Sequence, residues 1–219
     1  MITYEMLRND PTVCVYVKEA DASLSALGYT EHSFSHVCRV ADVAGNILYQ
    51  LNYPQRTVEL AKISALLHDI GNLVNRVDHS QSGAIIAFRL LDKMGMDPSE
   101  IATVVTAIGN HDEGTAVPVN AVSAALFLAD KSDVRRTRVR NKDIASFDIH
   151  DRVNYSVTAS SLTVDKEKAH ICLSLTIDTE YSSVMDYFEI FLTRMTLCRK
   201  AAEKLGMSFK LTINGQQLL

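Results

Sequence analysis

A histidine–aspartate doublet at the end of an apolar segment is the feature that most constrains this chain. His68-Asp69 follows an apolar run that begins at Ile63, and Ile70-Gly71 comes directly after it. Four of the seven histidines and two aspartates form one set of positions: His36, His68, Asp69, His79, His111 and Asp130. Neutral imidazoles and carboxylates hold divalent transition metals. The sequence therefore predicts a metal site.

Two members of this set are polar where a helix should be apolar. His36 lies in register with Val40, Val43 and Ile47 on the apolar face of a predicted helix. A lone histidine there would ordinarily be a satisfied core residue. Asp130 closes an apolar run that begins at Ala124, where an unpaired carboxylate would be costly to bury. A bound cation would offset that cost, and the whole set favours metal binding over separate core roles.

Size and composition indicate a folded protein of one large domain, or of a core domain with a small appendage. The chain has 219 residues, of which 47% are hydrophobic and 22% are charged. Its net charge of −4 argues against general nucleic-acid binding.

A cytoplasmic location is expected. The first residues lack the basic start and apolar stretch of a secretion signal. The longest uncharged run, Gly114 to Ala129, contains Pro118 and is too short to cross a bilayer. Four cysteines without a C-x-x-C pair are typical of reduced, buried thiols.

Capping signals and helical spacing predict six consecutive helices in the first two thirds of the chain. They run between Asp10 and Gly28, from Thr30 or Ser33 to Leu51, from Val58 to His68, from about His79 to Met94, from Asp97 to about Gly109, and from Asn120 through Asp130. Short connections between such helices favour a compact bundle.

The pattern changes after Asn141. Residues 154–164, 169–177 and 208–213 have the alternation and β-branched content of strands, and a helix is expected between Ser182 and Leu205. We therefore predict a mainly α fold, with a helical domain over residues 1–145 and a small α+β (β-β-α-β) C-terminal module over residues 146–219. The module could dimerise, bind a regulator or cover the bundle, and its strand edges leave room for a homodimer.

The histidine and aspartate pattern resembles that of the HD superfamily of metal-dependent phosphohydrolases. The matching residues are His36, His68-Asp69 and Asp130, within the segments ALLHDIG (65–71) and LADK (128–131). The resemblance covers roughly residues 30–140. It implies an HD-domain helical bundle in which His36, His68, Asp69 and Asp130 hold one metal ion.

Two further histidines extend the resemblance to the two-metal branch of the superfamily. His79-Ser-Gln-Ser-Gly83 is similar to an H-x-x-x-G segment of that branch, and His111-Asp-Glu113 to a second segment. The resemblance implies that His79 and His111 hold a second ion, with Asp69 bridging the two. The alternative is that both histidines cap helices or bind phosphate. Iron or manganese is expected, and the sequence does not separate them from zinc, nickel, cobalt or magnesium.

Candidates for substrate binding and proton transfer lie near the predicted ligands. Lys131 begins a stretch of twelve residues with six basic side chains, including Arg135 and Arg136, and arginine grips phosphate oxygens well. Arg76 lies in the loop before His79 and could line the entrance to the site. Asp69 and Asp112 are the candidate catalytic carboxylates, with Asp112 placed to accept a proton or orient water. The alternative is that these charged loop residues are exposed to solvent and take no part in the site.

The set as a whole predicts a phosphohydrolase that uses metal-activated water. The expected substrate is a small phosphorylated molecule, with a nucleotide as one option. The order of segments is also similar to small HD hydrolases that cut dinucleoside polyphosphates, although Asn72 stands where many relatives have lysine. Two other functions remain open. One is a di-iron oxygenase, because the six-ligand set also resembles inositol oxygenase and the phosphonate-cleaving oxygenases. The other is a non-catalytic sensor that binds a nucleotide.

Overall fold

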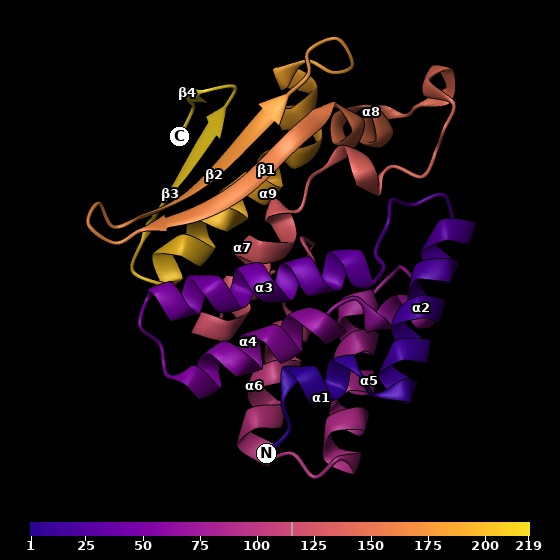
Figure 1. The fold of residues 1–219 in the computed structure, drawn as a ribbon, viewed down its shortest axis with the longest axis vertical. Coiled ribbons are helices and arrows are strands. Elements are labelled where there is room, and N and C mark those ends of the chain that lie inside the picture. Colours follow the sequence, from indigo (N-terminus) through magenta and orange to yellow (C-terminus); the bar gives the residue numbers. More distant parts are fainter. Residues whose placement is uncertain (115) are drawn as a thin grey trace.

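The N-terminal part of the protein is a bundle of helices in the computed structural model, which describes residues 1–114 and 116–219 (Figure 1). The helices are α1 (Tyr4–Arg8), α2 (Pro11–Ala26), α3 (Phe34–Gln50), α4 (Gln55–Leu67), α5 (His79–Lys93), α6 (Pro98–Gly109) and α7 (Ala121–Ser132), with a 3₁₀ turn η1 (Ile70–Leu73) between α4 and α5. Two further 3₁₀ turns, η2 (Arg136–Arg138) and η3 (Ile144–Ser146), follow α7.

Capping side chains set the starts of these helices, as the sequence predicts. Asp10 accepts hydrogen bonds from the backbone N–H groups of Thr12 and Val13, and Ser33 caps α3. Asp97 caps α6, and Asn120 forms a reciprocal capping box with Ser123. Each cap satisfies backbone donors that have no partner inside the helix.

Helix α7 is the centre of the bundle. Every residue from Val122 to Ala129 is buried, as expected for a helix that is apolar on all sides. It packs against α3, α4, α6 and α9. Because α7 ends inside the protein, Asp130 in its last turn is delivered to the interior.

The C-terminal part combines a short helix, a four-stranded sheet and a long helix. Helix α8 (Ile149–Ser156) is followed by β1 (Val157–Asp165), β2 (His170–Ile177), α9 (Val184–Lys204), β3 (Ser208–Ile213) and β4 (Gln216–Gln217). The strand order is β1-β2-β3-β4, and only the β2–β3 pair is parallel. Helix α9 makes the crossover that a parallel pair requires.

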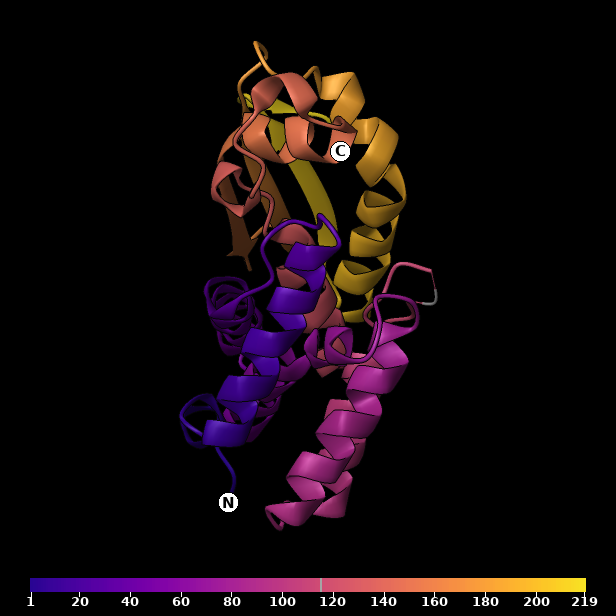
Figure 2. The same cartoon turned by 90° about the vertical axis from the view of Figure 1, so that its right-hand side faces the viewer.

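Helix α9 joins the sheet to the bundle. Alternate residues of β2 and β3 are buried on one face of the sheet, including Leu173 and Leu211. Tyr187 and Met195 of α9 are buried as well, and α9 packs on both β3 and α7. In Figure 2 the sheet, α8 and α9 occupy one end of the molecule and α5 and α6 the other. One cluster of buried side chains runs through both parts.

The mainly α fold with a small sheet is confirmed, and the structure corrects some details. The expected strand at residue 154 begins at Val157, because Asp148 caps α8 and residues 154–156 complete that helix. Helices α1 and α8 and strand β4 were not predicted. The boundary between residues 145 and 146 stays a prediction. No helix within residues 1–114 or 116–219 has both the length and the apolar character needed to cross a membrane.

A contact between two glycines brings α5 against the end of α4. A Cβ atom added to Gly71 would lie 1.9 Å from the backbone oxygen of His79 and 2.5 Å from the nitrogen of Gly83. Only a residue without a side chain allows the two backbones to approach this closely. The start of α5, and with it His79, is thereby placed beside His68-Asp69.

Gly71→Ala should therefore destabilise the protein and move His79. The added methyl group meets backbone atoms, which cannot give way as a flexible side chain can. We expect a loss of about 3 kcal/mol in the free energy of unfolding, measured by denaturant titration. Gly109→Ala is the matched control, since its Cβ would meet nothing closer than Ala84 Cβ at 3.7 Å. Equal stability of the two variants would contradict the close packing at Gly71.

Candidate metal centre

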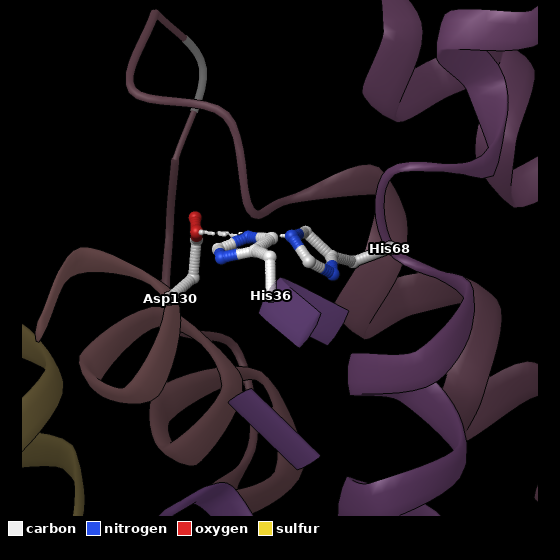
Figure 3. Close-up of side chains that lie close together, drawn as sticks. All are labelled: His36, His68 and Asp130. Atoms are coloured by element: carbon white, nitrogen blue, oxygen red, sulfur yellow. Dashed lines mark ion pairs between the residues drawn. The ribbon is translucent and has the colours of Figure 1, made fainter. Parts of the chain in front are cut away.

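The six predicted ligands meet at one place, where five helices begin or end. His36 lies in the first turn of α3, and His79 is the first residue of α5. His68-Asp69 follows α4, His111 follows α6, and Asp130 is in the last turn of α7. Figure 3 shows the imidazoles of His36 and His68 and the carboxylate of Asp130 close together. Because several helices can meet at their ends, residues at those ends can point toward one shared site.

Three ligand atoms form a first group around Asp130. His36 Nε2 lies 3.4 Å from Asp130 Oδ1, and His68 Nε2 lies 3.7 Å from the same oxygen. One ligand atom from each of His36, His68 and Asp130 lies within 4.8 Å of the others. Asp69 Oδ2 is 3.1 Å from His68 Nε2 and 3.6 Å from His36 Nε2. These four residues are the predicted ligands of one ion.

The second group faces the other oxygen of the same carboxylate. Asp69 Oδ1 lies 3.6 Å from His79 Nε2 and 3.8 Å from His111 Nε2. The two imidazoles approach each other, with their Nε2 atoms 3.1 Å apart. Asp69 thus turns one oxygen to each pair of histidines, as a bridging carboxylate would.

Hydrogen bonds at Nδ1 orient all four imidazoles. His68 donates to the backbone oxygen of Ala65 at 2.7 Å. The equivalent bonds run from His111 to Ile108 O at 2.6 Å and from His79 to Arg76 O at 3.0 Å. His36 instead bonds Asp133 Oδ2 at 2.7 Å. With Nδ1 as the donor, Nε2 carries the lone pair that a metal ion needs.

The residues present fit a divalent cation. His36 Nε2 and His68 Nε2 are buried and have no hydrogen-bond partner among the residues that the structure describes. Asp69 is only 6% exposed, so its charge requires compensation. Imidazole nitrogens and carboxylate oxygens converging without another partner are the donor set of a transition-metal site.

The pKa values reflect the same charge requirement. Burial disfavours the imidazolium form of His68, but the carboxylates of Asp69 and Asp130 outweigh burial and raise the pKa of His68 to about 10. Burial opposes ionisation of Asp69, yet His68 and His111 hold its pKa well below the usual range. Burial lowers the pKa of His79 to about 4, although Asp69 acts against that shift. His79 is therefore neutral and ready to bind a metal ion at pH 7.

Asp133 holds the His36 ring in place through Nδ1, and the sequence did not predict this role. Its side chain is almost fully buried. It accepts from His36 Nδ1, and Arg39 and Arg135 approach its Oδ1 at 3.1 and 2.8 Å. Arg138 donates to its backbone oxygen. Asp133 is the single acid in a basic stretch, one turn after Asp130, but this local pattern does not connect it with His36.

A cavity of about 380 Å³ opens onto the ligands. Two of the predicted substrate-binding residues, Arg76 and Lys131, line it. Arg135 does not, because it is paired with Glu31 and Asp133. Arg136 does not line it either, and pairs with Asp178 in the C-terminal part. Asp112 follows His111 but is not among the lining residues.

Helices α8 and α9 and the segment before α3 complete the cavity wall. The lining residues that the sequence did not suggest are Tyr29, His32, Asp148, His150, Asp151, Asn154, Phe191 and Arg194, together with Leu27, Gly28 and Thr30. Arg138, from the basic stretch that begins at Lys131, also lines the cavity. His32 stacks edge-on against His36, with ring centroids 5.3 Å apart. Several of these residues lie in the segment expected to be an appendage, so no local pattern connected them with the site.

Comparison with known proteins places most of this site within one family. Residues 33–152, more than half of the chain, match the model of the HD domain. A similar solved structure is a predicted HD superfamily hydrolase from an uncultured Thermotogales bacterium. It is 31% identical, the match covers 57% of this chain and 67% of that one, and the TM-score is 0.45. No curated protein matches the sequence.

Asp133→Asn should weaken metal binding without removing a ligand. The amide lacks the charge that holds His36 Nδ1–H, so the His36 ring loses its fixed orientation. Loss of such a supporting group costs about 10- to 100-fold in metal affinity, measured by titration of chelator-stripped protein with Mn²⁺. Asp42→Asn is the control, because the Asp42 side chain on α3 is 72% exposed. Equal affinity in both variants would show that Asp133 does not support the site.

Metal binding should also release a proton from His68. With its pKa raised to about 10, His68 is protonated at neutral pH in metal-free protein, and a metal ion must displace that proton. The affinity should rise about tenfold per pH unit between about pH 7 and pH 9. Calorimetry in buffers of different ionisation enthalpy measures the release. A binding heat independent of the buffer would contradict this assignment.

Proposed function

The chain belongs to the HD-domain family, and from its site we propose that it is a metal-dependent phosphohydrolase. Family and site together support the coarser assignment, a metal-dependent hydrolase. The proposed substrate is a phosphate ester or anhydride of a nucleotide or of another small phosphorylated metabolite. The observation that carries the proposal is the placement of Asp69, whose two oxygens face two separate pairs of histidines.

Six residues would hold two divalent ions, with iron or manganese proposed. His36, His68, Asp69 and Asp130 form the first site, and His79 and His111 complete a second with Asp69. Ions held there would lower the pKa of a shared water and neutralise phosphate oxygens. The chain's own contribution is to fix the ligand rings through Nδ1 and to keep the carboxylates ionised.

Cationic side chains beside the ligands favour a phosphorylated substrate. Lys131 Nζ is 2.7 Å from Asp130 Oδ2, and Arg76 Nη1 is 3.3 Å from His79 Nε2. Arg138 and Arg194 also line the cavity. Arginine and lysine bind phosphate oxygens by charge-assisted hydrogen bonds. Positive charge at the cavity favours a substrate that carries phosphate over an uncharged one.

Asp112 remains the proposed proton acceptor, next in sequence to His111. It lies outside the cavity lining, and its negative charge opposes a small part of the lowering of the His79 pKa that burial causes. Arg135 and Arg136 are not part of the proposed substrate site, since they do not line the cavity and their guanidinium groups pair with Glu31, Asp133 and Asp178.

Removal of Asp69 provides the direct test. Wild-type protein loaded with Mn²⁺ or Fe²⁺ should release phosphate or a nucleoside monophosphate from some member of a panel of phosphorylated metabolites. Asp69→Ala should lower this activity at least about a thousandfold, because the bridging carboxylate stabilises both ions. Elemental analysis should show fewer ions in the variant. Asp92→Ala, an exposed carboxylate on α5, should leave both activity and metal content unchanged.

Two results would redirect the assignment. Oxygen consumption with a mixed-valence iron signal, and no phosphate release, would identify the alternative di-iron oxygenase. Tight nucleotide binding without turnover in fully metallated protein would identify a sensor.

A further inference from the structure

Helix α9 carries an arginine to the cavity from outside the matched HD region. Arg194 lies on the face of α9 that includes the buried residues Phe191, Met195 and Cys198. Its side chain is 24% exposed, and it lines the same cavity as Asp69 and Asp130. The family match ends at residue 152, so Arg194 belongs to the part of the chain that this match does not describe.

The guanidinium group of Arg194 is held from two sides. Its Nε donates to Glu113 Oε1 at 2.7 Å. Its Cζ lies 4.1 Å from the centroid of the Phe191 ring, which supports the guanidinium plane. The two terminal nitrogens make no hydrogen bond to any of the described residues, so a planar pair of donors remains available.

A short chain of charges connects Arg194 to the metal ligands. Glu113 Oε1, which accepts from Arg194, is also 3.4 Å from Lys131 Nζ. Lys131 Nζ is in turn 2.7 Å from Asp130 Oδ2. Glu113 thus holds both cations, and three successive ion pairs link Arg194 to Asp130, a predicted metal ligand.

We propose that Arg194 binds the phosphoryl oxygens of the substrate through its terminal guanidinium nitrogens. A guanidinium group that is held through Nε and lies against an aromatic ring keeps its two terminal nitrogens in one orientation. This orientation suits bidentate binding of a tetrahedral oxyanion. The inference rests on the proposed function and adds a substrate-binding residue to it. It also gives the C-terminal part a role in the site, since α9 brings the guanidinium group of Arg194 to the cavity wall.

Two substitutions test the role of Arg194. Arg194→Ala removes the guanidinium group, and Arg194→Lys keeps the positive charge but loses the two terminal N–H donors that could bind one oxyanion together. In Mn²⁺-loaded protein we expect Arg194→Ala to weaken binding of inorganic phosphate, and to raise KM for the best ester of the panel, each by about 10- to 100-fold. Arg194→Lys should lie between this variant and the wild type. Arg199→Ala, an exposed arginine on the same helix, should bind phosphate as the wild type does.

Metal content and thermal unfolding are measured in parallel to separate binding from folding. A loss of phosphate affinity with unchanged metal content supports the proposal. A folded, fully metallated Arg194→Ala protein with wild-type phosphate affinity and KM would overturn it. If Arg194→Ala does not fold, wild-type phosphate affinity in Arg194→Lys has the same meaning. Failure of the wild type to hydrolyse any ester would count against the proposed function, whereas phosphate affinity would still decide the role of Arg194.

Discussion

The carboxylate of Asp69 is the group on which the site depends. It is buried between two pairs of imidazoles, with Oδ2 toward His36 and His68 and Oδ1 toward His79 and His111. An isolated buried carboxylate would be strongly unfavourable, so the surrounding groups must carry compensating positive charge or donate hydrogen bonds. Asn72 donates to Asp69 Oδ1 at 3.1 Å. A neutral amide adds no positive charge, so the remaining compensation would come from ions held at the proposed site.

Three of the histidines also complete the turns on which they stand. His68, His79 and His111 each donate Nδ1–H to the carbonyl three residues earlier, at Ala65, Arg76 and Ile108. Each bond reaches a carbonyl oxygen in the turn before the histidine and aims Nε2 at the site, and Ile108 O also accepts from the backbone N–H of His111 at 3.3 Å. His36 stands in the first turn of α3, where no such carbonyl is free, and it depends on Asp133 instead. That difference explains why one ligand requires support from a residue 97 positions away.

The features that could be predicted from the sequence are those that depend on neighbouring residues in the chain. Helix starts at Asp10, Asp97 and Asn120 follow from local caps, and the six candidate ligands from their residue types at predicted helix ends, so the bundle and the residues that converge in it were accessible from the sequence. Contacts between distant segments were not. Asp133 reads locally as part of a charged surface stretch, and its role exists only because α3 lies beside the end of α7. Likewise the β-branched residues after Asn154 favoured a strand, but the cap at Asp148 carries helix α8 through Ser156.

The C-terminal part changes how substrate selection in this protein should be understood. The predicted ligands and Lys131 all lie within the matched HD region, so the proposed metal chemistry belongs to the bundle. The cavity wall continues through Asp148, Asn154, Phe191 and Arg194, which are supplied by α8 and its cap and by α9. Because α9 is fixed between α7 and the sheet, the distance from this wall to the metal ligands is set by core packing and not by a loose linker. A different C-terminal segment on the same bundle would retain the metal ligands and present a different wall, so substrate preference should depend on α8 and α9 more than on the histidines.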